Sequence, residues 1–185
     1  MKSLFKIAGC LLLGLGSFTA VKAQNASGNA QQTVKLALAG VMELTFVNTN
    51  SQTGNTVSLV FDDVQDYSDG VESSEQNLRV RSNKKFQVHV ESATKYFTYT
   101  GSATSGNNMK VKDVLKMKVV ANNTGGPTTN GFNNYKSIED DDERFINNAD
   151  AGDNQTFAIK YKATPGYSYA PGTYTTDVIF TLTEH

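Results

Sequence analysis

The chain has 185 residues, with 17 Lys and Arg against 18 Asp and Glu, and a net charge of −1 at pH 7. A balance this close to neutral does not favour binding to nucleic acid or to an anionic membrane surface. The chain has two histidines, His89 and His185, and one cysteine, Cys10. A structural zinc site needs four His or Cys ligands and a catalytic one usually needs three protein ligands, so we do not expect transition-metal chemistry.

The N-terminal residues predict export. Lys2 and Lys6 come before an apolar run over residues 7–15, and the ending Val21-Lys22-Ala23 follows. A basic start, a short apolar core and a small-x-small ending are typical of a secretory signal. The apolar run is shorter than the roughly 20 residues that a membrane span requires. We therefore expect a signal peptide over residues 1–23 and a location in the periplasm, at the cell surface or outside the cell.

Cys10 lies in the sequence Ile7-Ala8-Gly9-Cys10, which is similar to the lipobox of bacterial lipoproteins. A lipobox cysteine follows the apolar core, whereas here the core continues through residues 11–13, so we expect Cys10 to leave with the signal. Removing 23 of the 185 residues, three of them basic and none acidic, leaves 162 residues with a net charge of −4 and no cysteine. Without disulfides, stability must come from the apolar core, and one domain of this length can bury enough of it.

The remaining chain predicts an all-β fold. Residues 24–32, QNASGNAQQ, are polar and predict a flexible leader. From Thr33 onward, apolar and polar residues alternate with period two in short runs, which is the pattern of half-buried strands. The runs cover residues 34–38, 44–46, 57–61, 78–80, 86–90, 117–119, 157–161 and 174–182. With turn-rich clusters between the runs, the pattern predicts one antiparallel β-sandwich domain over residues 33–185, with residues 109–116 as a single helical turn.

The stretch LRVRSNKKFQVHV, residues 78–90, carries its apolar side chains at even positions. Apolar residues of two paired strands share a face when the loop between them has an odd number of residues, and Asn83-Lys84-Lys85 fits a hairpin loop of three because Asn tolerates a left-handed backbone. An arch between two sheets fits the same spacing equally well. Either way the polar side chains share a solvated face. Single-strand binders place aromatic side chains on the basic face, and here Phe86 points the other way, so we do not expect nucleic-acid binding.

Residues that could carry catalysis are few. The sequence contains no G-x-S-x-G, no G-x-x-x-x-G-K-[ST] and no H-E-x-x-H, and no acid pair is singled out for glycoside hydrolysis, so we expect no enzyme and no cofactor. Acids gather in two runs, 62–75 and 139–143, and oxygen ligands on loops are what Ca²⁺ requires. Their spacing matches no EF-hand loop. Solvated acids are our main interpretation, and a calcium site is the alternative.

Tyrosines offer a candidate ligand face. Tyr96 and Tyr99 lie in KYFTYTG, and Tyr167 and Tyr169 lie in YKATPGYSYAPGTY. Exposed aromatic faces bind sugars in many secreted sandwiches. Tyrosine also anchors the corners of such folds through its hydroxyl, so core or corner packing is the other interpretation.

The segments LRVRSNKKFQVHVES and PGTYTTDVIFTLTEH resemble secreted bacterial β-sandwich proteins of the spore-coat-U and WxL types. The resemblance rests on Ser82-Asn83 between two strands, on Gly172-Thr173-Tyr174 at the start of the final strand, and on LALAGVMELTF as a first strand that kinks at Gly40. It implies an immunoglobulin-like sandwich at the cell envelope with a structural, pilus-subunit or adhesive role.

We therefore expect a non-catalytic, surface or adhesin-like or fibre-subunit protein that contacts other envelope or extracellular proteins, and a carbohydrate-binding module as the alternative. Residues 33–39 could close their own sandwich or pair with the edge of a neighbour, as in donor-strand fibres. The run 174–182 is long enough to complete a sheet, which favours self-closure. On that basis the isolated domain is expected to be a monomer that does not span a membrane, and deletion through Leu38 is expected to open an apolar groove.

Overall fold

The computed structural model describes residues 31–47, 54 and 56–185. The expected signal and most of the expected leader lie outside these residues. The chain divides into two units, residues 1–37 and 38–185. Residues 31–37, the described part of the first unit, form no helix or strand and are exposed. The second unit is built almost entirely from antiparallel strands.

The larger sheet has six strands. Five of them follow the order β1-β3-β9-β6-β7, and the sixth, β2, pairs with β9 next to β3. All of its pairings are antiparallel. Strand β9 is the longest of the described strands and lies at the centre of the sheet. The bounds are β1 Met42–Phe46, β2 Val71–Glu72, β3 Gln76–Ser82, β6 Leu115–Asn123, β7 Lys136–Ser137 and β9 Gly152–Ala163.

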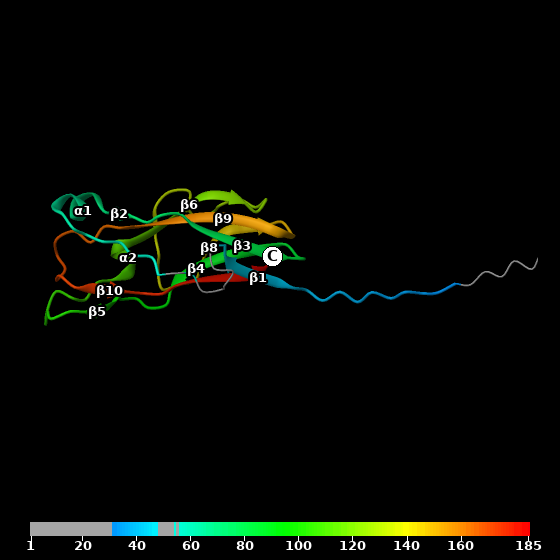
Figure 1. The fold of residues 1–185 in the computed structure, drawn as a ribbon, viewed down its shortest axis with the longest axis horizontal. Coiled ribbons are helices and arrows are strands. Elements are labelled where there is room, and N and C mark those ends of the chain that lie inside the picture. The colour runs from blue at the N-terminus through cyan, green and yellow to red at the C-terminus, as the bar shows by residue number, and fades with distance from the viewer. Residues whose placement is uncertain (1–30, 48–53, 55) are drawn as a thin grey trace, which may run out of the picture. The chain divides into compact units, whose positions relative to one another are not determined.

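The second sheet has three antiparallel strands in the order β11-β4-β8, and a separate two-stranded ribbon joins β10 to β5. The bounds are β4 Phe86–Ser92, β5 Thr98–Thr100, β8 Glu143–Ala149, β10 Thr173–Thr175 and β11 Val178–Glu184. Figure 1 shows β6 and β9 along one side of the body and β4 along the other, with the β5–β10 ribbon at one end. The predicted all-β sandwich is confirmed; the immunoglobulin-like connectivity stays a prediction.

Residues 78–90 form an arch rather than a hairpin. Strand β3 pairs with β1 and β9, whereas β4 pairs with β11 and β8, so the chain changes sheet at Asn83-Lys84-Lys85. Asn83 does not use a left-handed backbone there. Its side-chain amide instead donates to the carbonyl of Ala39 at 2.8 Å and accepts from the amide of Val41 at 2.9 Å. The predicted core face is confirmed, since the apolar residues at even positions from 78 to 90 are buried.

The core fills the space between the two sheets. Phe145 of β8 is fully buried, and its ring lies against three other aromatic rings. They belong to Phe132 at 5.7 Å, Phe157 at 5.5 Å and Phe180 at 5.9 Å between ring centroids. Because Phe157 is on β9 and Phe180 is on β11, Phe145 joins the two layers.

Two short helices are present among the described residues. Helix α2, Val111–Val114, confirms the turn expected within residues 109–116. Helix α1, Val64–Asp69, was not predicted. It begins at Asp63, whose carboxylate accepts from the amides of Gln65 and Asp66, and the Asp66 carboxylate accepts from the amide of Asp63 in return. This reciprocal capping box accounts for part of the acidic run 62–75.

Three expected runs differ in the structure. Residues 33–39 form no strand, and the first strand begins only at Met42, so the kinked first strand around Gly40 is wrong. Residues 57–61 also form no strand, although Val57, Leu59 and Phe61 pack against the core. The final run is interrupted at Thr176-Asp177, between β10 and β11. Strand β8 was not predicted at all.

Tyr161 of β9 makes the fold sensitive to alkali. Burial raises the pKa of its hydroxyl above the usual value of 10.0. The unfolded chain releases this proton near that pH while the folded chain retains it, so stability is complete below about pH 10 and falls as the pH rises further. Tyr161→Phe should reduce the loss of stability above about pH 10, measured as the urea midpoint at each pH. An equal effect of Tyr96→Phe, at an exposed position, would contradict this explanation.

In the described part of the chain, no helix is both long enough and apolar enough to cross a membrane.

Candidate functional site

The expected tyrosine face separates into two groups. Tyr99 and Tyr169 both pack against Tyr174, with ring centroids 5.0 and 6.5 Å from it. The Tyr99 hydroxyl donates to the carbonyl of Pro171 at 3.0 Å and accepts from the amide of Ala103 at 3.1 Å. Burial, followed by the neighbouring Tyr99 and Tyr169, raises the pKa of Tyr174. This group has the geometry of corner packing, because its rings cover one another and the Tyr99 hydroxyl is satisfied within the chain.

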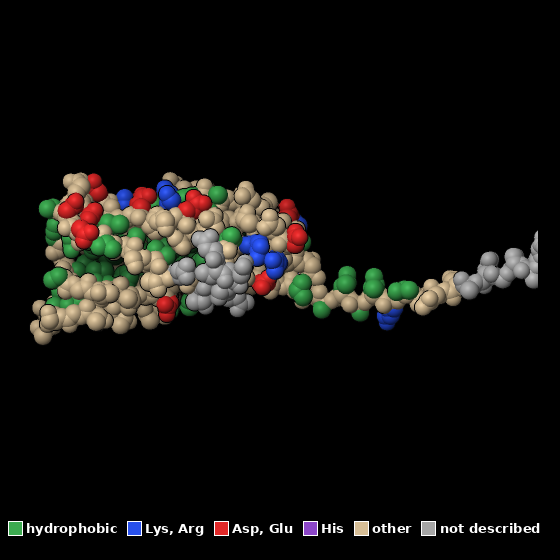
Figure 2. Space-filling view, in the orientation of Figure 1, with side chains coloured by type: hydrophobic (Ala, Val, Ile, Leu, Met, Phe, Trp, Pro, Cys, Tyr) green, Lys and Arg blue, Asp and Glu red, His purple; other side chains and the backbone are tan. Residues whose placement is uncertain are grey.

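Tyr167 belongs to the second group and presents more surface. Its side chain is 66% exposed, its ring stacks on Tyr67 at 5.6 Å, and its hydroxyl donates to the carbonyl of Val64 at 2.8 Å. Phe61 lies against the other ring of the pair, 5.4 Å from Tyr67. Figure 2 shows hydrophobic side chains in a hollow at this end of the body, between α1 and the β5–β10 ribbon. Tyr96 is also exposed, but on the loop that leads into β5, and no described aromatic ring stacks on it.

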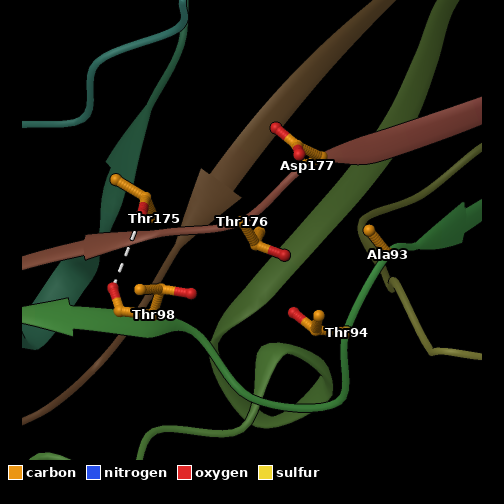
Figure 3. A pocket seen from close by; sticks show the side chains of 6 residues that line it. All are labelled: Ala93, Thr94, Thr98, Thr175, Thr176 and Asp177. Carbon is orange, nitrogen blue, oxygen red and sulfur yellow. Dashed lines mark hydrogen bonds between the residues drawn. The ribbon is translucent and has the colours of Figure 1, made fainter.

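A small cleft lies where two paired strands are interrupted at the same level (Figure 3). The ladder between β4 and β11 ends with the Ala93 amide donating to the carbonyl of Asp177 at 2.9 Å, and it resumes at the pair Thr98 and Thr175. Five residues, 93–97, separate β4 from β5, whereas two residues separate β10 from β11. The extra residues loop out and leave a space of about 120 Å³. It is lined by Ala93, Thr94, Thr98, Thr175, Thr176 and Asp177.

Threonine hydroxyls and the carboxylate of Asp177 are the polar side-chain groups of the cleft. The Thr94 hydroxyl already donates to the carbonyl of Tyr96 at 2.8 Å, and the Thr176 hydroxyl is buried with no partner among the described residues. A cleft of this size is smaller than the few hundred Å³ of typical small-molecule sites, so it can take part of a ligand only. The sequence analysis missed it, because the alternation of residues 174–182 continues across the interruption.

Three acids of the second run pair with basic side chains of the same chain. Glu139 lies 3.6 Å from the ammonium of Lys112, Asp142 lies 2.7 Å from Nδ1 of His89, and Glu143 pairs with Lys136. Among the described residues, no group of three or more His, Cys, Asp or Glu side chains is arranged to hold a metal ion. Five of the acids considered as calcium ligands have such roles within the chain. Asp63 and Asp66 cap helix α1, and Glu139, Asp142 and Glu143 pair with basic side chains.

The segment 33–39, called here the leading segment, presents large apolar side chains to solvent. Val34, Leu36 and Leu38 are 75%, 81% and 89% exposed. They occupy alternate positions, so they would share one face if the segment were a strand. Residues 33–39 form no strand, so the expected first strand that would close the chain's own sandwich is not found there.

Two strands at the margins of the sandwich leave core-facing side chains half-buried. Strand β1 is at the edge of the larger sheet, with Leu44 and Phe46 half-buried, and β11 is at the edge of the smaller sheet, with Phe180 and Leu182 half-buried. Edge strands carry backbone groups that can pair with an added strand.

No protein-family model matches this chain, and no curated protein matches it in sequence.

Proposed function

We propose that this protein is a non-catalytic, exported surface protein of the fibre-subunit or adhesin-like kind, and that it acts by contact with neighbouring subunits. The observation that carries the proposal is the leading segment, which presents three large apolar side chains to solvent on alternate residues. The N-terminal export pattern of residues 1–23 supports a location at the cell surface.

The physical argument is that exposed apolar side chains with period two are completed by strand addition. Full burial of one Val or Leu side chain is favourable by about 1.5–3 kcal/mol, and the leading segment carries three. Strand addition would also pair backbone groups with an open sheet edge, which is how extended peptides add to sheets. We expect the acceptor to be β1 or β11 of a second copy, because both edges have half-buried apolar side chains beside them.

Sedimentation velocity over a concentration series tests this proposal. The complete chain should associate as its concentration rises, and Leu36→Asp should abolish association because it places a charge on the apolar face. Ala37→Asp is the matched control: it adds the same charge one residue away, where the side chain of an added strand would point to solvent. Loss of association in both variants, or a monomeric complete chain at every attainable concentration, would contradict the proposal.

Deleting residues 24–38 should leave a folded monomer of unchanged stability, since the described side chains of this stretch are exposed. This replaces the expectation that the deletion opens an apolar groove and causes aggregation.

A carbohydrate-binding module is the second candidate, favoured by the exposed ring of Tyr167. Its ring is stacked on that of Tyr67, which leaves the other face of the Tyr167 ring open to a sugar. An array of neutral glycans separates the two candidates, because binding that is lost in Tyr167→Ala would support the module and is not required by strand addition.

A further inference from the structure

Four lysines meet on the outer face of the larger sheet. The sequence places two in β6, at Lys116 and Lys118, and two in β9, at Lys160 and Lys162. The register brings them together, since Lys116 is directly opposite Lys162 and Lys118 is directly opposite Lys160. We call Lys116, Lys118, Lys160 and Lys162 the lysine quartet.

Cross-strand neighbours have Cβ atoms about 4.5–5.5 Å apart, and like charges placed directly opposite each other destabilise a sheet. Two such pairs in succession form a grid of positive charge. Among the described residues, Glu72 is the one carboxylate within 4.0 Å of a quartet ammonium, 3.9 Å from Lys162. The quartet therefore retains a local positive charge on a chain whose net charge is −1.

Tyr135 contacts two members of the quartet. The ammonium groups of Lys118 and Lys162 lie over its ring, 4.4 and 5.9 Å from the centroid. Cation–π contacts of this kind hold the two side chains above the sheet without neutralising them. Two of the four cations are thus held at an aromatic ring, and all four project from one hydrogen-bonded strand pair.

We propose that the lysine quartet binds an acidic polysaccharide, with carboxylate or sulfate groups of successive sugar units placed over the two lysine pairs. A flat grid of ammonium groups fits a chain of regularly spaced anions. Nucleic acid fits less well: reading a duplex groove requires a protruding helix or ribbon, and single strands require open aromatic faces, whereas the Tyr135 ring lies beneath two lysines. The lysine quartet is separate from the leading segment. A negative result for polysaccharide binding would therefore not bear on the proposed function.

Binding of the purified protein to polygalacturonate and to dextran sulfate tests the proposal, with oligothymidylate and anionic vesicles as comparison probes. We expect binding to at least one of the two polysaccharides that weakens as salt rises. Lys118→Gln/Lys160→Gln should weaken it roughly tenfold or more, because two surface cations are lost. The matched control is Lys95→Gln/Lys110→Gln, which removes the same charge elsewhere and should preserve the affinity.

Melting temperatures of the same variants test whether they remain folded. Lys118→Gln/Lys160→Gln should melt at the same or a higher temperature than the unmodified protein at low salt, because it removes a like-charge pair. Dextran sulfate should raise the melting temperature of the unmodified protein more than that of this variant. The proposal is overturned by absence of binding to both polysaccharides at low salt, by equal losses in the two double variants, or by tighter binding to oligothymidylate or vesicles.

Discussion

Phe145→Ala should lower the free energy of unfolding by about 4 kcal/mol, the range for truncating a large buried aromatic residue. The side chain is fully buried and touches the rings of Phe132, Phe157 and Phe180. Its removal would leave a cavity between the layers that neither sheet can close alone, because Phe157 and Phe180 are fixed on different sheets. Urea unfolding followed by circular dichroism measures the change.

Tyr96→Ala is the control for this prediction. It truncates an aromatic side chain that is exposed and makes no described ring contact, so it should cost about 1 kcal/mol or less. If Phe145→Ala costs no more than Tyr96→Ala, Phe145 does not join the two layers as described.

Gly126→Ala should cost about 3 kcal/mol, at the upper end of what overpacking usually costs. Gly126 lies in the loop after β6, which packs along β8. A Cβ at this position would lie 2.3 Å from the carbonyl oxygen of Asn147 and 2.7 Å from the amide nitrogen of Ala149. Both atoms belong to the backbone of β8, so relief requires moving the strand rather than turning a side chain.

Gly131→Ala separates this steric effect from backbone strain. Gly131 has φ +84°, but a Cβ there would meet its nearest neighbour only at 3.9 Å. Its replacement should cost about 1 kcal/mol, the penalty of a left-handed conformation alone. Thermal or urea unfolding of both variants compares them, and an equal cost would show that the loop does not hold Gly126 tightly against β8.

The sequence predicted the strands in which alternation was regular. Residues 78–90 showed it clearly, and parity alone left hairpin and arch equally acceptable. The choice between them depends on β1 and β9, which pair with β3, and on β8 and β11, which pair with β4. Such partners are distant in sequence, so local pattern could not decide the matter.

Strand β8 was missed because its alternation is broken. Phe145 and Ile146 are consecutive and both fully buried, and the register between β4 and β8 shifts at this place. A bulge puts neighbouring residues on the same face, which hides a strand from a period-two search. The acids that precede Phe145 also made the region resemble a loop.

The leading segment shows the opposite error. Its alternation was regular, yet residues 33–39 form no strand, because pattern identifies side chains suited to a strand without supplying the partner. The lysine quartet was visible as Lys-Met-Lys and Lys-Tyr-Lys in two predicted strands. That these strands are neighbours, with the lysines in register, could not be read from either segment alone.

Hydrogen exchange of the backbone amides of residues 34–38, measured in dilute and in concentrated protein, tests strand addition most directly. In dilute protein these amides should exchange at nearly the rate of an unfolded chain, because the segment forms no strand of its own. In concentrated protein they should become protected together with amides of β1 or β11 at the accepting edge. Amides that exchange at the unfolded rate in an associated sample, or that are already protected in the dilute monomer, would contradict the account.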